Sequence, residues 1–257
     1  MRRGRNMSMH AKLFLCLLAA GLAAVGCRQH QTDAECAVEP SPDSMVEEAP
    51  AAAPDTKTEA LLRSFGLVDV QELDLTIQVH LVYATADNFV GEVLYADLHK
   101  AFLLPQMAEK VARAQQQLRA ERPDLSLMIL DAARPLSIQR KMFHLVAGTP
   151  RNIYVSNPKH GPGLHNYGAA VDVTLVDTLG RLLDMGTAFD HFGPEAHTDN
   201  EALLVREGKI SREAFENRRL LRRVMKEAGL QPLRSEWWHF NLMPREQARR
   251  RLKPIDW

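Results

Sequence analysis

The composition of the sequence changes at about residue 58, and only the part of the chain that follows has enough apolar residues to fold. Residues 28–58 hold four prolines and seven acidic residues, with almost no large apolar side chain. Such a segment cannot bury enough apolar surface to offset the conformational entropy lost on ordering. We therefore expect residues 27–58 to form a disordered tether and residues 59–257 to form one globular domain.

Residues 1–26 have the pattern of an export signal. They carry four basic residues and no acidic residue. An apolar run of 13 residues, from Leu13 to Val25, directly precedes Gly26-Cys27. This run is shorter than the ~20 residues that span a bilayer. The sequence from Ala24 to Cys27 is typical of a bacterial lipoprotein processing site, at which Cys27 would be lipidated. The alternatives are a plain signal peptide and a short membrane anchor. We expect an exported bacterial protein, periplasmic or at the cell surface and anchored to a membrane by lipid.

Cysteine and charge content limit the remaining domain further. Residues 59–257 contain no cysteine, so no disulfide bond stabilises this part of the chain. Basic and acidic residues are balanced there, and the whole chain has a formal net charge of zero. Nucleic-acid binding needs a concentrated positive surface, which this balance does not predict. These features do not determine an oligomeric state.

Hydrophobic patterning predicts an α+β fold. Strands and helices interleave without regular βαβ spacing, which favours a mixed or antiparallel sheet packed by helices. Four strands are expected, at residues 76–84, 125–130, 170–176 and 236–242. Three helices are expected, at residues 105–118, 137–146 and 211–228, with a loop at residues 150–163.

The segment from His165 to Val173 brings an imidazole near a carboxylate. Gly168 permits a tight turn, and the two alanines after it allow close backbone approach. In the strand that follows, Asp172 points to one face while its valine neighbours point to the other. A turn before this strand would return His165 to the side of Asp172. The alternative is an unrelated loop histidine and a capping aspartate.

A second segment, Glu236-Trp237-Trp238-His239-Phe240, has the pattern of a strand. In an extended conformation Trp238 and Phe240 pack into the core while His239 faces the other side. Glu236 lies three residues before His239, near enough to reach the same site without being a ligand. The alternative is an aromatic core strand with incidental polar neighbours.

Two imidazoles and an aspartate match the ligands of a catalytic zinc ion, which keeps three protein ligands and one position for water. Zinc lowers the pKa of that water to about 7, and a free carboxylate can accept its proton and pass it to a leaving amine. Glu236 is the candidate for this carboxylate. Arg134, next to a predicted strand, can stabilise the oxyanion formed when water attacks a carbonyl. It can equally begin a surface helix.

These segments, in this order, resemble the D-alanyl-D-alanine dipeptidases of the vancomycin-resistance type. This family belongs to the zinc D,D-peptidases, which share a core with the hedgehog signalling domain. The family motifs are Ser-x-His-x-x-Gly-x-Ala-x-Asp and Glu-x-Trp-His, which match Gly163 to Asp172 and Glu236 to His239. The resemblance spans about residues 74–243. It also includes Tyr83 to Gly91, Ala133-Arg134-Pro135, Met185 to Asp190 and Asn217-Arg218-Arg219.

The resemblance implies one zinc ion per chain, with the ligands His165, Asp172 and His239. It implies Glu236 as general base and acid, and Arg134 as the group that stabilises the tetrahedral intermediate. Tyr83 and Asp190 would bind substrate, Asp190 through the free ammonium group of a dipeptide. The implied reaction is attack of zinc-bound water on D-alanyl-D-alanine or a similar short D-amino-acid dipeptide. The export signal suggests a role in cell-wall turnover or salvage and not in control of a cytoplasmic precursor pool.

One departure from the family pattern concerns the substrate carboxylate. Gly163 and Leu164 stand where the family has serine, and neither can offer a hydroxyl. Strict preference for D-alanyl-D-alanine therefore stays open. A D,D- or L,D-carboxypeptidase acting on peptidoglycan stem peptides would keep the same metal site. A non-catalytic zinc-binding module would have no use for Glu236, and a structural lipoprotein would bind no metal.

Overall fold

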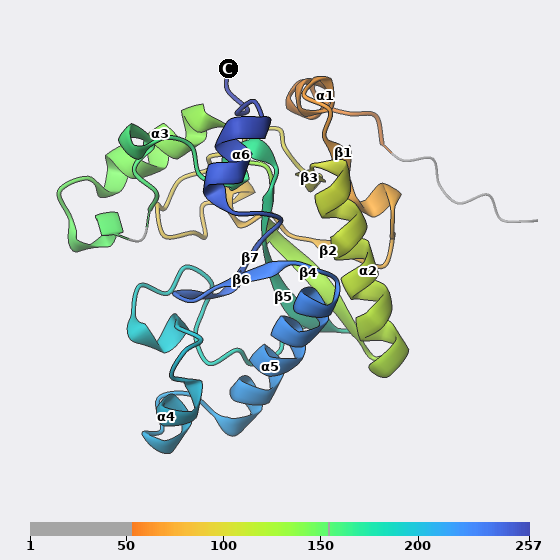
Figure 1. The fold of residues 1–257 in the computed structure, drawn as a ribbon, viewed down its shortest axis with the longest axis vertical. Helices are drawn as coiled ribbons and strands as arrows, with labels where there is room; N and C mark the ends of the chain where they lie inside the picture. The colour runs from red at the N-terminus through yellow and green to blue at the C-terminus, as the bar shows by residue number, and fades with distance from the viewer. Residues whose placement is uncertain (1–52, 154) are drawn as a thin grey trace, which may run out of the picture. The chain divides into compact units, whose positions relative to one another are not determined.

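The computed structural model describes residues 53–153 and 155–257 (Figure 1). The predicted export signal, Cys27 and most of the predicted tether lie outside the described residues. Among the helices that are described, none is long and apolar enough to cross a lipid bilayer.

The folded domain begins slightly before the predicted boundary at residue 59. Helix α1 (Lys57–Ser64) starts after Thr56, whose side chain accepts a hydrogen bond from the backbone N–H of Glu59. The Glu59 side chain accepts one from the backbone N–H of Thr56 in return, which completes a capping box. Asp55 forms an ion pair with Lys100, with 2.7 Å between Oδ1 and Nζ. These contacts include residues 55–58 in the domain.

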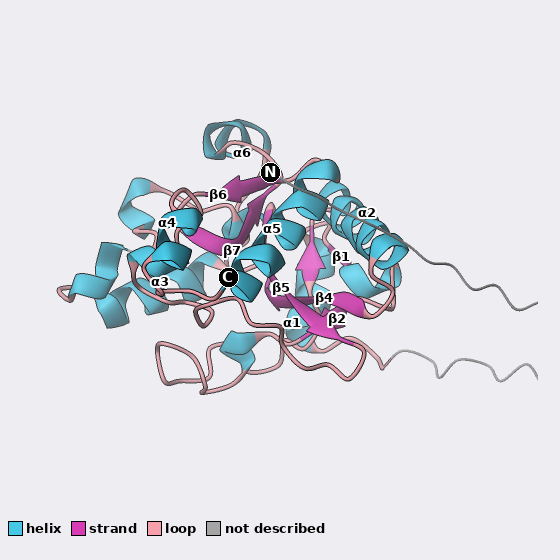
Figure 2. Cartoon of the chain, turned by 90° about the horizontal axis from the view of Figure 1, so that it is seen from below, coloured by secondary structure: helices cyan, strands magenta, loops and turns pink. Residues whose placement is uncertain are grey.

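A mixed five-stranded sheet lies at the centre of the described domain, in the order β2-β4-β5-β7-β6 (Figure 2). β2 runs parallel to β4, and the other neighbours are antiparallel. This confirms the predicted α+β class with a mixed sheet. The strands are β2 (Gln78–Val79), β4 (Leu125–Asp131), β5 (Ala170–Asp177), β6 (Gln231–Leu233) and β7 (Glu236–Asn241). A separate antiparallel pair consists of β1 (Val68–Asp69) and β3 (Phe102–Leu103).

Two long helices pack against each other and against this sheet, α2 (Pro105–Glu121) and α5 (Arg212–Glu227). The face of α2 that includes Met107, Val111 and Leu118 is buried, as its spacing predicts. The remaining helices are α3 (Leu136–Val146), α4 (Glu201–Arg206) and α6 (Arg245–Arg251). The central strand β5 is buried over seven of its eight residues, so the core lies on both of its faces.

The strand predicted at residues 76–84 is much shorter than expected. Only Gln78–Val79 pairs, and a 3-10 turn follows at Val82–Ala84. The carbonyl oxygen of Tyr83 accepts hydrogen bonds from the backbone N–H groups of Leu94 (2.9 Å) and Tyr95 (3.0 Å) instead of from a neighbouring strand. The alternating apolar side chains predicted a strand, but they are buried in a turn instead. The loop after residue 84 folds back over them.

Candidate metal centre

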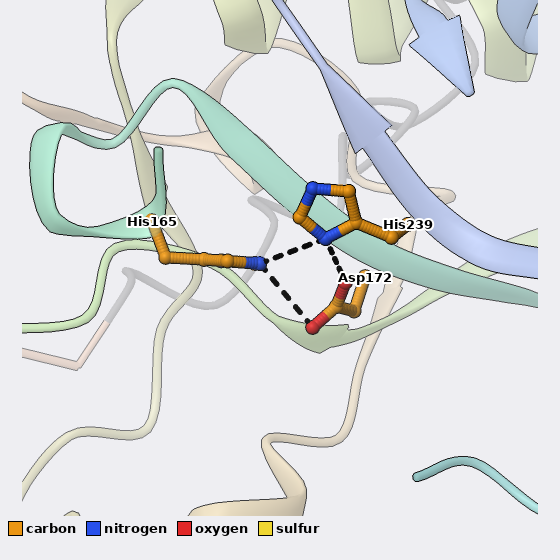
Figure 3. A group of neighbouring side chains, drawn as sticks. All are labelled: His165, Asp172 and His239. Carbon is orange, nitrogen blue, oxygen red and sulfur yellow. Dashed lines mark hydrogen bonds and ion pairs between the residues drawn. The ribbon is translucent and has the colours of Figure 1, made fainter. Parts of the chain in front are cut away.

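Three of the predicted site residues, His165, Asp172 and His239, meet at one point (Figure 3). His165 Nε2 lies 3.4 Å from Asp172 Oδ2 and 3.2 Å from His239 Nδ1. His239 Nδ1 lies 2.9 Å from Asp172 Oδ1. One donor atom from each residue thus lies within 4.8 Å of the other two. Over the described ranges of the chain, this is the one group of at least three such residues that could hold a metal ion.

Strand pairing brings two of these residues together. Asp172 on β5 is directly opposite His239 on β7, and on its other side it is opposite Asp131 at the end of β4. A register shift after Ile129 places Asp131 in this position. Because side chains directly opposite each other across a sheet lie close together, the register fixes the separation of Asp172 and His239.

A tight turn before β5 brings in the third residue. The 3-10 turn His165–Tyr167 ends at Gly168, whose φ of 66° is in the left-handed region. A Cβ atom at Gly168 would lie 2.8 Å from Leu67 Cδ2 and 3.2 Å from the backbone nitrogen of Leu104. Glycine is therefore required here both for the backbone conformation and for the close approach of the neighbouring chain.

Hydrogen bonds orient both imidazole rings. His165 Nδ1 lies 2.7 Å from the carbonyl oxygen of Ala132, and His239 Nε2 lies 2.8 Å from Asn241 Oδ1. With these nitrogens donating, His165 Nε2 and His239 Nδ1 are the ring nitrogens left to bind a metal ion, and in the metal-free cluster a proton on His239 Nδ1 is donated to Asp172 Oδ1. Outer-shell acceptors of this kind fix the tautomer and the orientation of metal-binding histidines.

Asp172 and His239 form a charged pair in the metal-free cluster. Burial raises the pKa of Asp172, but the charges of His165 and His239 and their hydrogen bonds outweigh it and hold that pKa below its usual range. Burial lowers the pKa of His239, but the hydrogen bond to Asp172 and its charge raise it to about 9. Two nitrogen donors and a carboxylate match zinc, which takes imidazole and carboxylate ligands and leaves an open position in catalytic sites. The residues present therefore fit a zinc ion.

Glu236 lies beside this cluster and outside it. Its Oε2 is 3.8 Å from His239 Nδ1. In a regular strand, positions three apart face opposite sides, but a register shift between β6 and β7 brings Glu236 to the side of His239. Burial raises the pKa of Glu236 and the charge of Asp172 adds to this, while His239 opposes it. A carboxylate with a raised pKa is suited to both accept and return a proton.

Arg134 is buried next to the cluster and is not a surface residue. Its Nε donates to Asp131 Oδ2 at 3.0 Å, its Nη2 donates to the same oxygen, and its Nη1 donates to Gln139 Oε1 at 2.9 Å. The guanidinium carbon lies 5.1 Å from the ring centroid of Tyr83. Tyr95 completes the arrangement with a hydrogen bond of 2.7 Å from its hydroxyl to Asp131 Oδ1. These contacts hold the guanidinium rigidly.

Tyr83 and Asp190 form a pair, with 2.7 Å between the hydroxyl oxygen and Asp190 Oδ2. Burial raises the pKa of Tyr83, so its hydroxyl stays protonated and donates to the carboxylate. Burial also raises the pKa of Asp190 well above its usual value. Asp190 has a φ of 58°, the single positive φ at a non-glycine residue in the described part of the chain. Backbone strain of this kind is concentrated at functional sites.

All seven residues predicted for the metal, catalytic and substrate-binding sites line one cavity of about 330 Å³. Gly163 and Leu164, where the family pattern has serine, also line it. Sequence reasoning missed six further polar residues of the cavity wall, which are Gln139, Ser156, His191, Gln231, Asn241 and Arg245. Of these, Asn241 carried a weak signal, because it lies two positions after His239 and a strand places both on one face.

Comparison with known proteins agrees with this geometry. A family profile described as D-ala-D-ala dipeptidase matches residues 63–253. The chain is 32% identical to the D-alanyl-D-alanine dipeptidase of Escherichia coli (strain K12) over 180 residues, covering 68% of this chain and 84% of that protein. It is 27% identical to the D-alanyl-D-alanine dipeptidase of Enterococcus faecalis over 197 residues, covering 69% of this chain and 92% of that protein. The chain therefore belongs to Peptidase M15, the D-Ala-D-Ala dipeptidase family of zinc metallopeptidases.

Proposed function

We propose that this chain is a zinc dipeptidase that hydrolyses D-alanyl-D-alanine or a similar short dipeptide of D-amino acids. The observation that carries the proposal is the position of Glu236, which lies beside a three-residue metal cluster but outside it. The same cavity is lined by the residues predicted to bind the metal and the substrate and by Arg134. The relatives named as D-alanyl-D-alanine dipeptidases support the choice of substrate.

His165, Asp172 and His239 would hold the zinc ion. When bound, zinc supplies a Lewis acid that lowers the pKa of water and polarises the carbonyl of the scissile amide. Glu236 accepts the proton of the attacking water at its carboxylate and then donates it to the leaving amine. Its raised pKa favours proton uptake from the water, because burial makes the protonated carboxyl group easier to form.

Arg134 stabilises the negative charge that develops on the carbonyl oxygen. Asp131 and Gln139 engage only part of its five N–H donors, so the remaining N–H groups are available to a substrate oxygen. Since the guanidinium is already held in place, it needs no reorganisation as charge develops.

Asp190, held by Tyr83, binds the free ammonium group of the dipeptide. An ammonium beside this carboxylate would stabilise its ionised form against the effect of burial. A carboxypeptidase that acts on longer peptides has no free ammonium at this position, so the pair favours a dipeptidase.

The test compares the wild type with Glu236→Gln, on D-alanyl-D-alanine and on its N-acetylated form. We expect the substitution to lower kcat by about 10²–10⁴-fold with one zinc ion per chain retained in both proteins. We expect the N-acetylated dipeptide to be a poor substrate. Full activity in Glu236→Gln would contradict the mechanism, and faster hydrolysis of the N-acetylated form would indicate a carboxypeptidase. A protein without zinc or turnover would contradict the whole proposal.

We also propose that the protein is exported and anchored to a membrane through lipidated Cys27. The basic and apolar pattern of residues 1–26 supports this. Labelling with radioactive palmitate should mark the wild type and not Cys27→Ser, and the variant should leave the membrane fraction. An unlabelled wild type would contradict the anchor.

A further inference from the structure

One guanidinium of the cavity wall has no acidic partner. Arg245 donates from Nε to the carbonyl oxygen of Pro162 at 2.9 Å and from Nη2 to the carbonyl oxygens of Gly161 (2.5 Å) and His160 (3.4 Å). Within the described residues, no carboxylate forms an ion pair with it, and its Nη1 donates to no protein acceptor. Arg134, in the same cavity, has its charge balanced by Asp131. The half-buried charge of Arg245 is thus available to an anion.

Ser156 provides a hydroxyl on the same wall. Its Oγ makes no hydrogen bond to any part of the chain that the structure describes. A Cβ atom built on Gly163 would lie 3.6 Å from this Oγ, so the hydroxyl lies next to the place that a side chain at position 163 would occupy. Pro162, which Arg245 holds through its carbonyl oxygen, directly precedes Gly163. The hydroxyl and the guanidinium therefore border the same short stretch of backbone.

The cavity accordingly carries a negative and a positive group on different segments. Asp190 lies between β5 and α4, whereas Arg245 is the first residue of α6. A free dipeptide is a zwitterion with an ammonium group at one end and a carboxylate at the other. Its ammonium suits Asp190, and its carboxylate then needs a cation and a hydroxyl or N–H donor elsewhere in the cavity.

We propose that Arg245 and Ser156 form the subsite for the carboxylate of the dipeptide substrate. The inference rests on the proposed function. It adds that these two residues make the enzyme specific for a peptide with a free C-terminus. Arg245 is already held by three carbonyl groups of residues 160–162, so binding costs little side-chain entropy. Together with Asp190, this subsite restricts the cavity to a ligand with two free ends.

The experiment measures binding by calorimetry in the Glu236→Gln background, in which the ligand survives. The two ligands are D-alanyl-D-alanine and D-alanyl-D-alaninamide, which lacks the carboxylate charge. Arg245→Met should weaken binding of the free dipeptide by about tenfold or more and leave binding of the amide within about twofold. Ser156→Ala should act in the same direction, by about threefold to tenfold. Arg245→Lys should recover part of the lost affinity for the free dipeptide.

The matched control is Arg249→Met. Arg249 lies one helical turn further along α6 and also donates to the carbonyl oxygen of His160, but it does not line the cavity. This variant should bind both ligands as the parent protein does. Arg249→Met removes a contact to the turn at residues 160–163 but no charge from the cavity. If the effect of Arg245→Met came from loosening this turn, both variants should weaken both ligands.

Equal weakening of both ligands by Arg245→Met, or no weakening of either, would overturn the subsite. Hydrolysis by the wild type tests the proposed function separately. If the wild type hydrolyses the dipeptide but Arg245→Met weakens both ligands equally, or weakens neither, the proposed function stands and the subsite is contradicted. If Arg245→Met weakens only the free dipeptide but the wild type does not hydrolyse it, the subsite stands and the proposed function is contradicted.

Discussion

The metal cluster and the charged ends of the cavity are held in place by different means. Asp172 and His239 occupy paired positions of two central strands, and the cluster's geometry follows from backbone register. The segment that carries Asp190 and the turn at residues 160–163 are loops, each held by an arginine that donates to backbone carbonyls. Arg218 bonds the carbonyls of Met185 (2.7 Å) and Glu195 (2.9 Å), as Arg245 does on the other side. We infer that changes in the loops alter substrate binding without altering the metal site.

The largest effect is expected from breaking the cluster. His239→Ala removes one of three ligands, so the zinc content should fall from about one per chain to near zero and activity should fall below detection. Elemental analysis and a hydrolysis assay measure both quantities. The exposed His144 on α3 supplies the control, since His144→Ala should change neither. Retention of stoichiometric zinc by His239→Ala would show that the cluster does not hold the metal.

A pH effect specific to the cluster is expected in protein freed of metal by a chelator. The folded pKa of His239, about 9, exceeds its unfolded value of 6.5. Its contribution to stability is therefore complete below pH 6.5 and is lost as the pH rises through 9. The loss should be roughly 3 kcal/mol at most. Urea unfolding at pH 6 and pH 9.5 measures it, and His239→Asn should reduce the difference by about this amount, while buried carboxyl groups with raised pKa values, such as Asp190, account for the part that remains. A wild-type stability that does not change over this range would contradict the raised pKa.

The smallest effect is expected from loosening the loop that carries Asp190. The Thr187 hydroxyl accepts a hydrogen bond of 2.8 Å from Trp237 Nε1, which connects this loop to β7. Thr187→Val keeps the shape but removes the acceptor, so KM for the dipeptide should rise by about threefold to tenfold. The zinc content and kcat should stay within about twofold. Thr187→Ser, which keeps the hydroxyl, is the control, and loss of zinc from Thr187→Val would show that the two regions are coupled.

The sequence allowed the chemical centre to be predicted because its residues lie in short segments with local rules. Strand alternation and a glycine-dependent turn indicate that His165 can lie near Asp172 and that His239 faces away from its aromatic neighbours. The meeting of the two segments at one metal ion was implied by the resemblance to the dipeptidase family. The position of Glu236 beside His239 depends on a register shift, which alternation alone does not reveal. Long helices such as α2 were predicted for the same reason, since their spacing repeats over several turns.

Features that depend on distant contacts were not predictable in this way. The two-residue strands β1 and β3 are too short to show any periodicity. Arg245 reaches carbonyl groups more than eighty positions earlier in the chain, and arginine-to-carbonyl contacts leave no local pattern. The hydroxyl of Ser156 beside Gly163 depends on how the intervening loop folds. The walls of the cavity were therefore less predictable than its centre.

The most direct test of the account is a crystal structure with anomalous diffraction data collected at the zinc absorption edge. We expect one anomalous peak, bonded to His165 Nε2, to His239 Nδ1 and to a carboxylate oxygen of Asp172, with Glu236 near the peak but not bonded to it. The use of different nitrogens by the two histidines follows from the outer acceptors Ala132 and Asn241. A peak elsewhere in the domain, or Glu236 bonded to the metal in place of one of the three, would contradict it.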